Sequence, residues 1–288
     1  MTFLHMVKFN YLRLFKHWSA YVLYGMVIAL VVGIGLFPHL HSGTAQPFTA
    51  YTNSDGRAPN YIGQDQEMPM LVQMIIIFAP YLFALLFGTM IFIAVSVESI
   101  EKISYLLLSK VSAFHILYSK VVAVLLFFMG LLTLGILGFL TLAAIGVIHP
   151  LELIHASHLN MGFGWRYGTA FILGILQIVM LFTLFALFIR ESSQLQTGMM
   201  IPGIITAVGW GVGYWMLLFK PNLLAHPFLT TSLQGIPIFN LFATIARLGS
   251  CSLTNLDLAV FIVATVLWLA LAHFSLRIVY AANQKINL

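Results

Sequence analysis

Three histidines and a glutamate recur at every third position after the third long apolar stretch of the chain. They are His149, Glu152, His155 and His158. Imidazole and carboxylate groups are zinc ligands, so a metal-dependent intramembrane hydrolase is one interpretation. Residues three apart on a helix are rotated by about 300°, which spreads these four side chains over half the circumference. The His pair four apart that zinc peptidases use is missing. Interfacial histidines without a ligand are the simpler interpretation.

Other chemistry is scarce, because ionisable side chains are almost absent from the apolar stretches. Gln177 and His273 are among the most polar side chains within them. Ion-coupled transporters place charged partners inside the bilayer, whereas a lone Gln or His in a span is usually an interhelical hydrogen-bond partner. The chain also lacks the Gly-x-x-x-x-Gly-Lys-Ser/Thr loop that binds nucleotide phosphates. If this protein moves a solute, we expect the energy to come from another subunit.

Six apolar stretches carry or flank these residues, and none contains Asp, Glu, Lys or Arg. Crossing a hydrocarbon core of about 30 Å takes roughly 20 helical residues. The predicted spans are Tyr21–Phe37, Met70–Val97, Val121–Ile148, Tyr167–Ile189, Thr197–Phe219 and Leu258–Leu276. Only 7% of the residues are charged and 61% are hydrophobic, whereas a soluble domain is about 25% charged. We therefore predict an all-α, polytopic integral membrane protein in which residues 1–288 form one transmembrane domain.

The positions of the basic residues predict the orientation. Cytoplasmic termini would place nine of them inside: Lys8, Arg13, Lys16, Lys102, Lys110, Lys120, Arg190, Arg277 and Lys285. Four would remain outside: Arg57, Arg166, Lys220 and Arg247. This bias favours a multi-pass plasma-membrane protein with both termini in the cytoplasm. No basic cluster suited to nucleic acid is present, and the single cysteine, Cys251, excludes an intrachain disulfide.

Two further segments are predicted to contact lipid without crossing the bilayer. Residues 2–18 mix apolar and basic side chains, which predicts either a helix lying flat among the headgroups or an extension of the first span. The segment Lys220–Asp257 is too apolar for an ordinary loop and contains Pro221, Pro227 and Pro237. It predicts short helices that dip partway into the outer leaflet. Irregular backbone at that depth must be buried in protein or line a wet cavity.

The segment that follows the second predicted span is the most informative for function. Glu98 and Glu101 stand where the chain leaves the membrane, and apolar residues around Leu107 follow them. A Ser-Lys-Val-Ser break comes next, and Lys120 stands at the foot of the third span. A surface helix with apolar anchors at helical spacing can dock into a groove on a partner.

This segment resembles the membrane subunits of ABC exporters of the second type, the ABC type-2 permeases. There a Glu-rich exit from span two leads into Glu-x-Gly-Thr-x-x-x-Leu-Leu-Ser-x-Pro-Val-Ser, and a Gly-Lys or Ser-Lys pair opens span three. The residues that match are Glu101, Leu107, Leu108, Ser109, Val111, Ser112, Ser119 and Lys120. Ile103-Ser104 replaces the Gly-Thr pair, and the proline before Val-Ser is missing. Weaker agreement covers the basic N-terminal segment and Phe239-Asn240-Leu241-Phe242 before span six.

The resemblance implies a coupling helix that contacts a separate ATPase subunit. The contact residues would be Glu98, Glu101, Leu107, Leu108, Ser109, Val111, Ser112 and Lys120. Two such ATPase subunits would bind ATP and Mg²⁺, so no cofactor is expected in this chain. The second membrane half would be another copy of the chain or a similar permease. Gly209 and Gly213 let backbones approach closely, either within the subunit or, as the resemblance favours, at the dimer contact.

The predicted function is the permease subunit of an ATP-driven exporter, and not an enzyme in itself. The apolar composition of the spans favours an amphipathic or hydrophobic cargo over a small ion. A hydrophobic peptide such as a bacteriocin or toxin is the first expectation, and a lipid-like molecule or drug is the second. Two alternatives remain open: the metal-dependent hydrolase based on the histidine run, and a non-enzymatic membrane scaffold.

Overall fold

The regular structure of this protein is helical wherever the chain is described. The computed structural model describes residues 3–15, 24–25, 70–100, 113–145, 161–224, 226, 232–250 and 253–286. Its elements are α1 (Phe3–Phe15), α3 (Met70–Ile100), α5 (Ala113–Ala144), α7 (Met161–Ala186), a 3-10 turn (Ser192–Gln194), α8 (Leu195–Phe219), α9 (Pro221–Leu224), α11 (Phe239–Gly249) and α12 (Asn255–Ile286). No strand occurs in these ranges, which confirms the all-α prediction.

Five helices are long and apolar enough to cross a membrane. The qualifying stretches are Ile76–Val97, His115–Ala144, Gly162–Ala186, Ser192–Phe219 and Asn255–Val279. They correspond to the second to sixth predicted spans. The first predicted span, Tyr21–Phe37, lies outside the described residues apart from residues 24 and 25, so the number six stays a prediction.

The helix that contains the third predicted span starts earlier than the span itself. The helix of the third span begins at Ala113 and not at Val121. Ile116, Leu117, Ser119 and Lys120 are buried while His115 is exposed, so one face of these first turns packs on the rest of the molecule. Packing of that face stabilises helix well before the uninterrupted apolar run begins.

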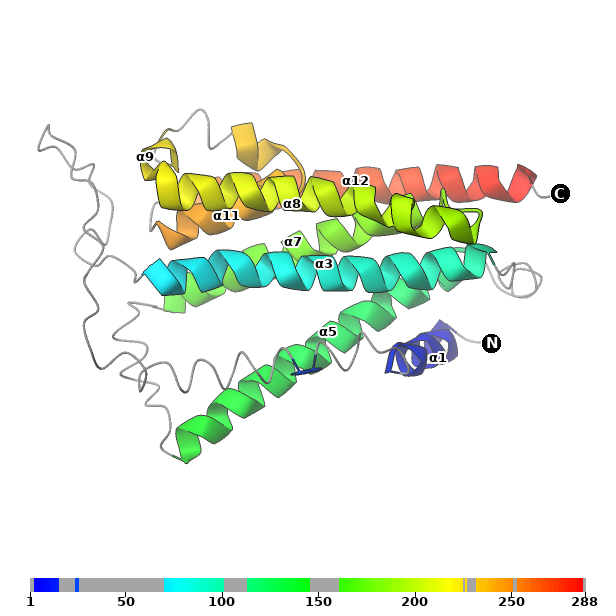
Figure 1. Cartoon of the computed structure of the whole chain (residues 1–288), viewed down its shortest axis with the longest axis horizontal. Coiled ribbons are helices and arrows are strands. Elements are labelled where there is room, and N and C mark those ends of the chain that lie inside the picture. Colours follow the sequence, from blue (N-terminus) through cyan, green and yellow to red (C-terminus); the bar gives the residue numbers. More distant parts are fainter. Residues whose placement is uncertain are drawn as a thin grey trace, which may run out of the picture.

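Successive long helices alternate in direction and form a bundle (Figure 1). The central helix is α7, which contacts α3, α8, α11 and α12. In the most apolar 18-residue stretch of α7, 67% of the residues are buried, against 22% in the corresponding stretch of α12. The exposed side of α12 is itself apolar: Val263, Val266, Leu267, Leu271 and Phe274. Large contiguous apolar surfaces are rare on soluble monomers, so hydrocarbon is the suitable environment for this helix.

The two ends of the bundle differ in what caps them. At one end, the α1 end, α1 lies beside the first turns of α5, and α12 finishes at the same end on the other side of the bundle (Figure 1). At the other end, the α11 end, lie α9 and the last turns of α11 (Figure 1). The expected short helices between the last two spans are therefore present. Their depth in a bilayer stays a prediction.

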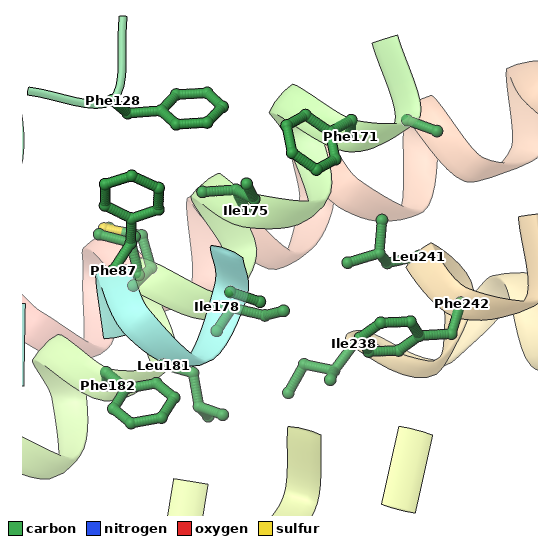
Figure 2. Close-up of a cluster of buried hydrophobic side chains, with 14 of the residues drawn as sticks. Phe87, Phe128, Phe171, Ile175, Ile178, Leu181, Phe182, Ile238, Leu241 and Phe242 are labelled. Carbon is green, nitrogen blue, oxygen red and sulfur yellow. The ribbon is translucent and has the colours of Figure 1, made fainter. Parts of the chain in front are cut away.

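The core is built from aromatic and branched aliphatic side chains (Figure 2). Phe87 of α3 and Phe128 of α5 meet edge to face, with ring centroids 4.9 Å apart. On the other side of α7, Leu241 of α11 packs so closely that a Cβ at Gly174 would overlap it. Glycine at this position of α7 therefore permits the close approach of α11 that Figure 2 shows.

Candidate functional site

The predicted contact with an ATPase is only partly within the described residues. Glu98 belongs to the last turn of α3, and its side chain is not described. Six of the predicted contact residues lie outside the described residues: Glu101, Leu107, Leu108, Ser109, Val111 and Ser112. Lys120 and the preceding Ser119 are described, and both belong to α5. We call residues 115–120 the α5 foot.

Lys120 connects the α5 foot to α3. Its Nζ donates a hydrogen bond to the carbonyl oxygen of Ala94 over 2.8 Å, and the residue is only 4% exposed. A lysine is rarely buried to this degree, because its charge loses the hydration of water. The carbonyl dipole of α3 replaces part of that hydration. Lys120 therefore joins α5 to α3 within the chain.

Ser119 connects the same turn to α1. Its Oγ donates to the carbonyl oxygen of Ile116 over 2.7 Å and accepts a hydrogen bond from Asn10 Nδ2 over 2.9 Å. Ser119 is fully buried, so its bond to Ile116 is shielded from water, whereas the bond from the half-buried Asn10 is shielded only in part. One helical turn earlier, His115 meets Phe3 edge to face, with ring centroids 5.7 Å apart. The amphipathic N-terminal helix is therefore fixed to α5 at two points.

A third tie joins the α5 foot to α12. The hydroxyl of Tyr118 contacts Nδ1 of His273, and the two rings are 5.6 Å apart between centroids. This confirms that His273 serves as an interhelical partner. The α5 foot therefore contacts α1, α3 and α12 through three successive residues, so a displacement of this turn would be passed to all three helices.

The segment before the last span turns back into the bundle at the opposite end. We call residues 232–249 the α11 hairpin. Ile238, at its tip, lies beside Gly209 of α8, and Gly249 lies beside Leu217 near the end of α8. Gly209 is ten residues before Phe219, which corresponds to about 15 Å along a helix. That distance is half of a hydrocarbon core of about 30 Å.

The tip of the α11 hairpin is irregular, and Gln177 of α7 satisfies its backbone. Ile238 has φ 75°, a left-handed conformation that is strained for a β-branched residue. Its N–H donates to Gln177 Oε1 over 3.0 Å. Gln177 Nε2 donates in turn to Thr265 Oγ1 of α12 over 2.5 Å. Gln177 is therefore an interhelical partner, as predicted, and irregular backbone here is buried in protein, as expected.

A buried ion pair holds the far end of the α11 hairpin. Arg247 Nη1 lies 2.6 Å from Asp257 Oδ1, and the two side chains are only 6% and 10% exposed. Asp257 also caps α12: its Oδ2 accepts from the backbone N–H of Thr254 over 2.9 Å, and Thr254 Oγ1 accepts from the Asp257 N–H over 3.2 Å. This reciprocal cap was readable from the Thr-x-x-Asp spacing. The pairing with Arg247 was not, because it joins separate helices.

Gly209 and Gly213 pack within the chain, which is one of their two predicted roles, and a role at a dimer contact stays a prediction. Both are buried against Phe242 of α11. A Cβ at Gly213 would stand 2.9 Å from the carbonyl oxygen of Phe242. The close approach that these glycines allow is therefore made within the subunit, to α11. Gly203 and Gly211 of the same helix have open space where a Cβ would stand.

The metal hypothesis falls outside the region that the structure describes. His149, Glu152, His155 and His158 all belong to residues 146–160, which are not described. Among the described residues, no group of three or more His, Cys, Asp or Glu side chains is placed to hold a metal ion. The metal-dependent hydrolase stays an untested alternative.

Comparison of the chain with protein-family models, with curated proteins and with solved structures found no match.

Proposed function

We propose that this protein is the membrane subunit of an ATP-driven exporter, of the type-2 permease kind that the α3–α5 connection resembles. Five long apolar helices support a place in the membrane. The scarcity of ionisable groups within them favours an external energy source over ion coupling. The observation that carries most weight is the α5 foot, where Tyr118, Ser119 and Lys120 contact three other helices.

In this proposal, two ATPase subunits bind ATP and Mg²⁺ and close on segments 98–120 of two membrane subunits. The partner membrane subunit is a second copy or a similar chain. The push enters at the α5 foot, and α1, α3 and α12 follow because they are hydrogen-bonded to it. The spans then rock and open a cavity toward the outside, with both termini in the cytoplasm.

The cargo in this proposal is amphipathic or apolar. Aromatic and aliphatic side chains dominate the five spans, and such surfaces select ligands by apolar contact rather than by charge. A hydrophobic peptide is the first candidate, and a lipid-like molecule or drug is the second.

The experiment is a tagged purification from the native membrane followed by an ATPase assay in nanodiscs. We expect an ATPase subunit with a phosphate-binding loop to purify with the chain. The double change Glu98→Lys and Glu101→Lys should abolish cargo-stimulated hydrolysis, because it reverses charge in the predicted contact. The matched control is Glu191→Lys, an exposed acid in the turn between α7 and α8 at the same end of the bundle. Full activity without any ATPase partner would overturn the proposal.

A further inference from the structure

The helix α1 has one buried face and one exposed apolar face. Met6 and Val7 are 4% and 7% exposed. Asn10 lies on the same face of the helix and donates a hydrogen bond to Ser119. On the opposite side, Leu4, Phe9 and Leu12 are 77%, 57% and 53% exposed. Burying a leucine or phenylalanine side chain is worth about 1.5 to 3 kcal/mol. Three such side chains on a helix of 13 residues therefore call for an apolar environment.

The exposed face also carries positive charge. Lys8 is exposed and stands four residues from both Leu4 and Leu12, so the three form one stripe along the helix. No Asp or Glu occurs in residues 1–54, whereas Lys8, Arg13 and Lys16 do. The N-terminal part of the sequence therefore supplies no carboxylate to this stripe. A surface that is both apolar and anionic is its natural complement.

The position of α1 identifies that surface as the lipid headgroup region. It meets α5 at His115 and Ser119, in the first turns of the candidate span His115–Ala144, and the hydroxyl of Tyr11 reaches toward Gly130 farther along this span. These turns form one end of the stretch of α5 that is long and apolar enough to cross a bilayer. An amphipathic helix at this level buries its apolar side chains at the acyl boundary, while its lysines reach the phosphates.

We infer that the Leu4–Lys8–Leu12 stripe of α1 binds the anionic headgroup region of the bilayer and so fixes the α5 foot at the membrane surface. Lys8 contacts lipid phosphate, and Leu4, Phe9 and Leu12 enter the acyl boundary. The bond from Asn10 to Ser119 passes this anchoring to α5. The inference does not depend on the proposed transport function.

The test compares amide hydrogen exchange of the full chain in phosphatidylcholine nanodiscs with exchange in nanodiscs that also contain phosphatidylglycerol. We expect phosphatidylglycerol to slow exchange in α1 by about fivefold, which corresponds to about 1 kcal/mol for one lysine at an anionic surface. Lys8→Glu should remove this difference. High salt should weaken it in the unmodified chain, because mobile ions screen the attraction.

The matched control is Lys220→Glu, which makes the same charge change at an exposed residue at the end of α8. It should leave the lipid effect on α1 intact. Exchange in the central helix α7 should be equal in all variants, which verifies that each is folded. Equal exchange of α1 in the two lipids would overturn the inference. So would a lipid effect that survives Lys8→Glu, since the apolar side chains alone would then account for it.

Discussion

The α5 foot and the α11 hairpin both join several helices, but they do so with different chemistry. At the α5 foot, a serine, a lysine and a tyrosine side chain bond to a neighbouring amide, carbonyl and imidazole. At the α11 hairpin, a buried ion pair and a buried glutamine connect the helices. In the first set Asn10 and Tyr118 are half-buried and His273 is exposed. The second set is enclosed, since residues 240–249 are all buried.

The difference has an energetic consequence. A bond that water can replace when it breaks is worth only about 0.5 to 1.5 kcal/mol, whereas a buried group left without its partner loses much more. We therefore expect the α11 hairpin to be stiff and costly to open. At the α5 foot the bonds from Asn10 and Tyr118 are only partly buried, so the links to α1 and α12 should yield more readily than the link of the buried Lys120 to α3.

The largest effect should come from the buried ion pair. Arg247→Met leaves the carboxylate of Asp257 buried without its cation, so the free energy of unfolding should fall by about 3 kcal/mol. The measurement is equilibrium unfolding in detergent, with loss of helix monitored by circular dichroism. Arg166→Met is the control, because Arg166 is half-buried and, among the described residues, donates to Leu253 and Asn255 alone. Equal losses in the two variants would contradict the comparison.

The next effect should come from the contact between α8 and α11. Gly213→Ala places a methyl group against the backbone of Phe242, and such overpacking costs about 2 kcal/mol. In the same helix, Gly203→Ala meets no atom within 4 Å. It should be neutral or stabilising by up to about 1 kcal/mol, because alanine favours helix over glycine. The same unfolding assay distinguishes the two, and a stable Gly213→Ala protein would show that α11 is not packed as described.

Removing the hydrogen bond between Ile238 and Gln177 should lower the free energy of unfolding by a somewhat smaller amount. Gln177→Leu leaves the N–H of Ile238 buried without an acceptor, which costs at least about 1 kcal/mol. The amide of Ile238 should also exchange with solvent faster, because its hydrogen bond is lost. Gln196→Leu changes an exposed glutamine of α8 and should leave both measurements unaltered. Unchanged exchange at Ile238 in Gln177→Leu would mean that this bond does not fix the tip.

The smallest effect should come from the α5 foot. Asn10→Ala removes one neutral hydrogen bond to Ser119, so the loss should be at most about 1 kcal/mol. Its signature should be local: faster amide exchange in α1, with exchange in α7 unchanged. Lys8→Ala, an exposed change on the other face of α1, should not alter exchange in detergent. A loss from Asn10→Ala as large as that from Arg247→Met would reverse the comparison of the two regions.

Much of the fold was predictable because hydrophobicity is a local property of the chain. Apolar stretches without charges identified five of the helices to within several residues, and the prolines and apolar residues of Lys220–Asp257 indicated short helices there. The role of Gln177 was also predictable, since a polar side chain within a span needs a partner on another helix.

Boundaries and partners were less predictable. The start of α5 at Ala113 depends on the burial of Leu117 and Lys120 against other helices, which no local pattern contains. The neighbours of Gly209 and Gly213 were likewise not predictable from the sequence. Their spacing indicates close packing of helices, and it does not say whether the neighbour belongs to the same subunit.

The sequence by itself determined that this protein is helical, that five of its helices are apolar enough to span a bilayer, and that ionisable side chains are scarce within them. These properties follow from residue type and spacing along the chain. Only the tertiary structure decided that Arg247 meets Asp257, that Gln177 supports Ile238 and that Asn10 holds Ser119. Each of these pairs joins different helices, and the geometry that brings them together arises from packing of the whole bundle.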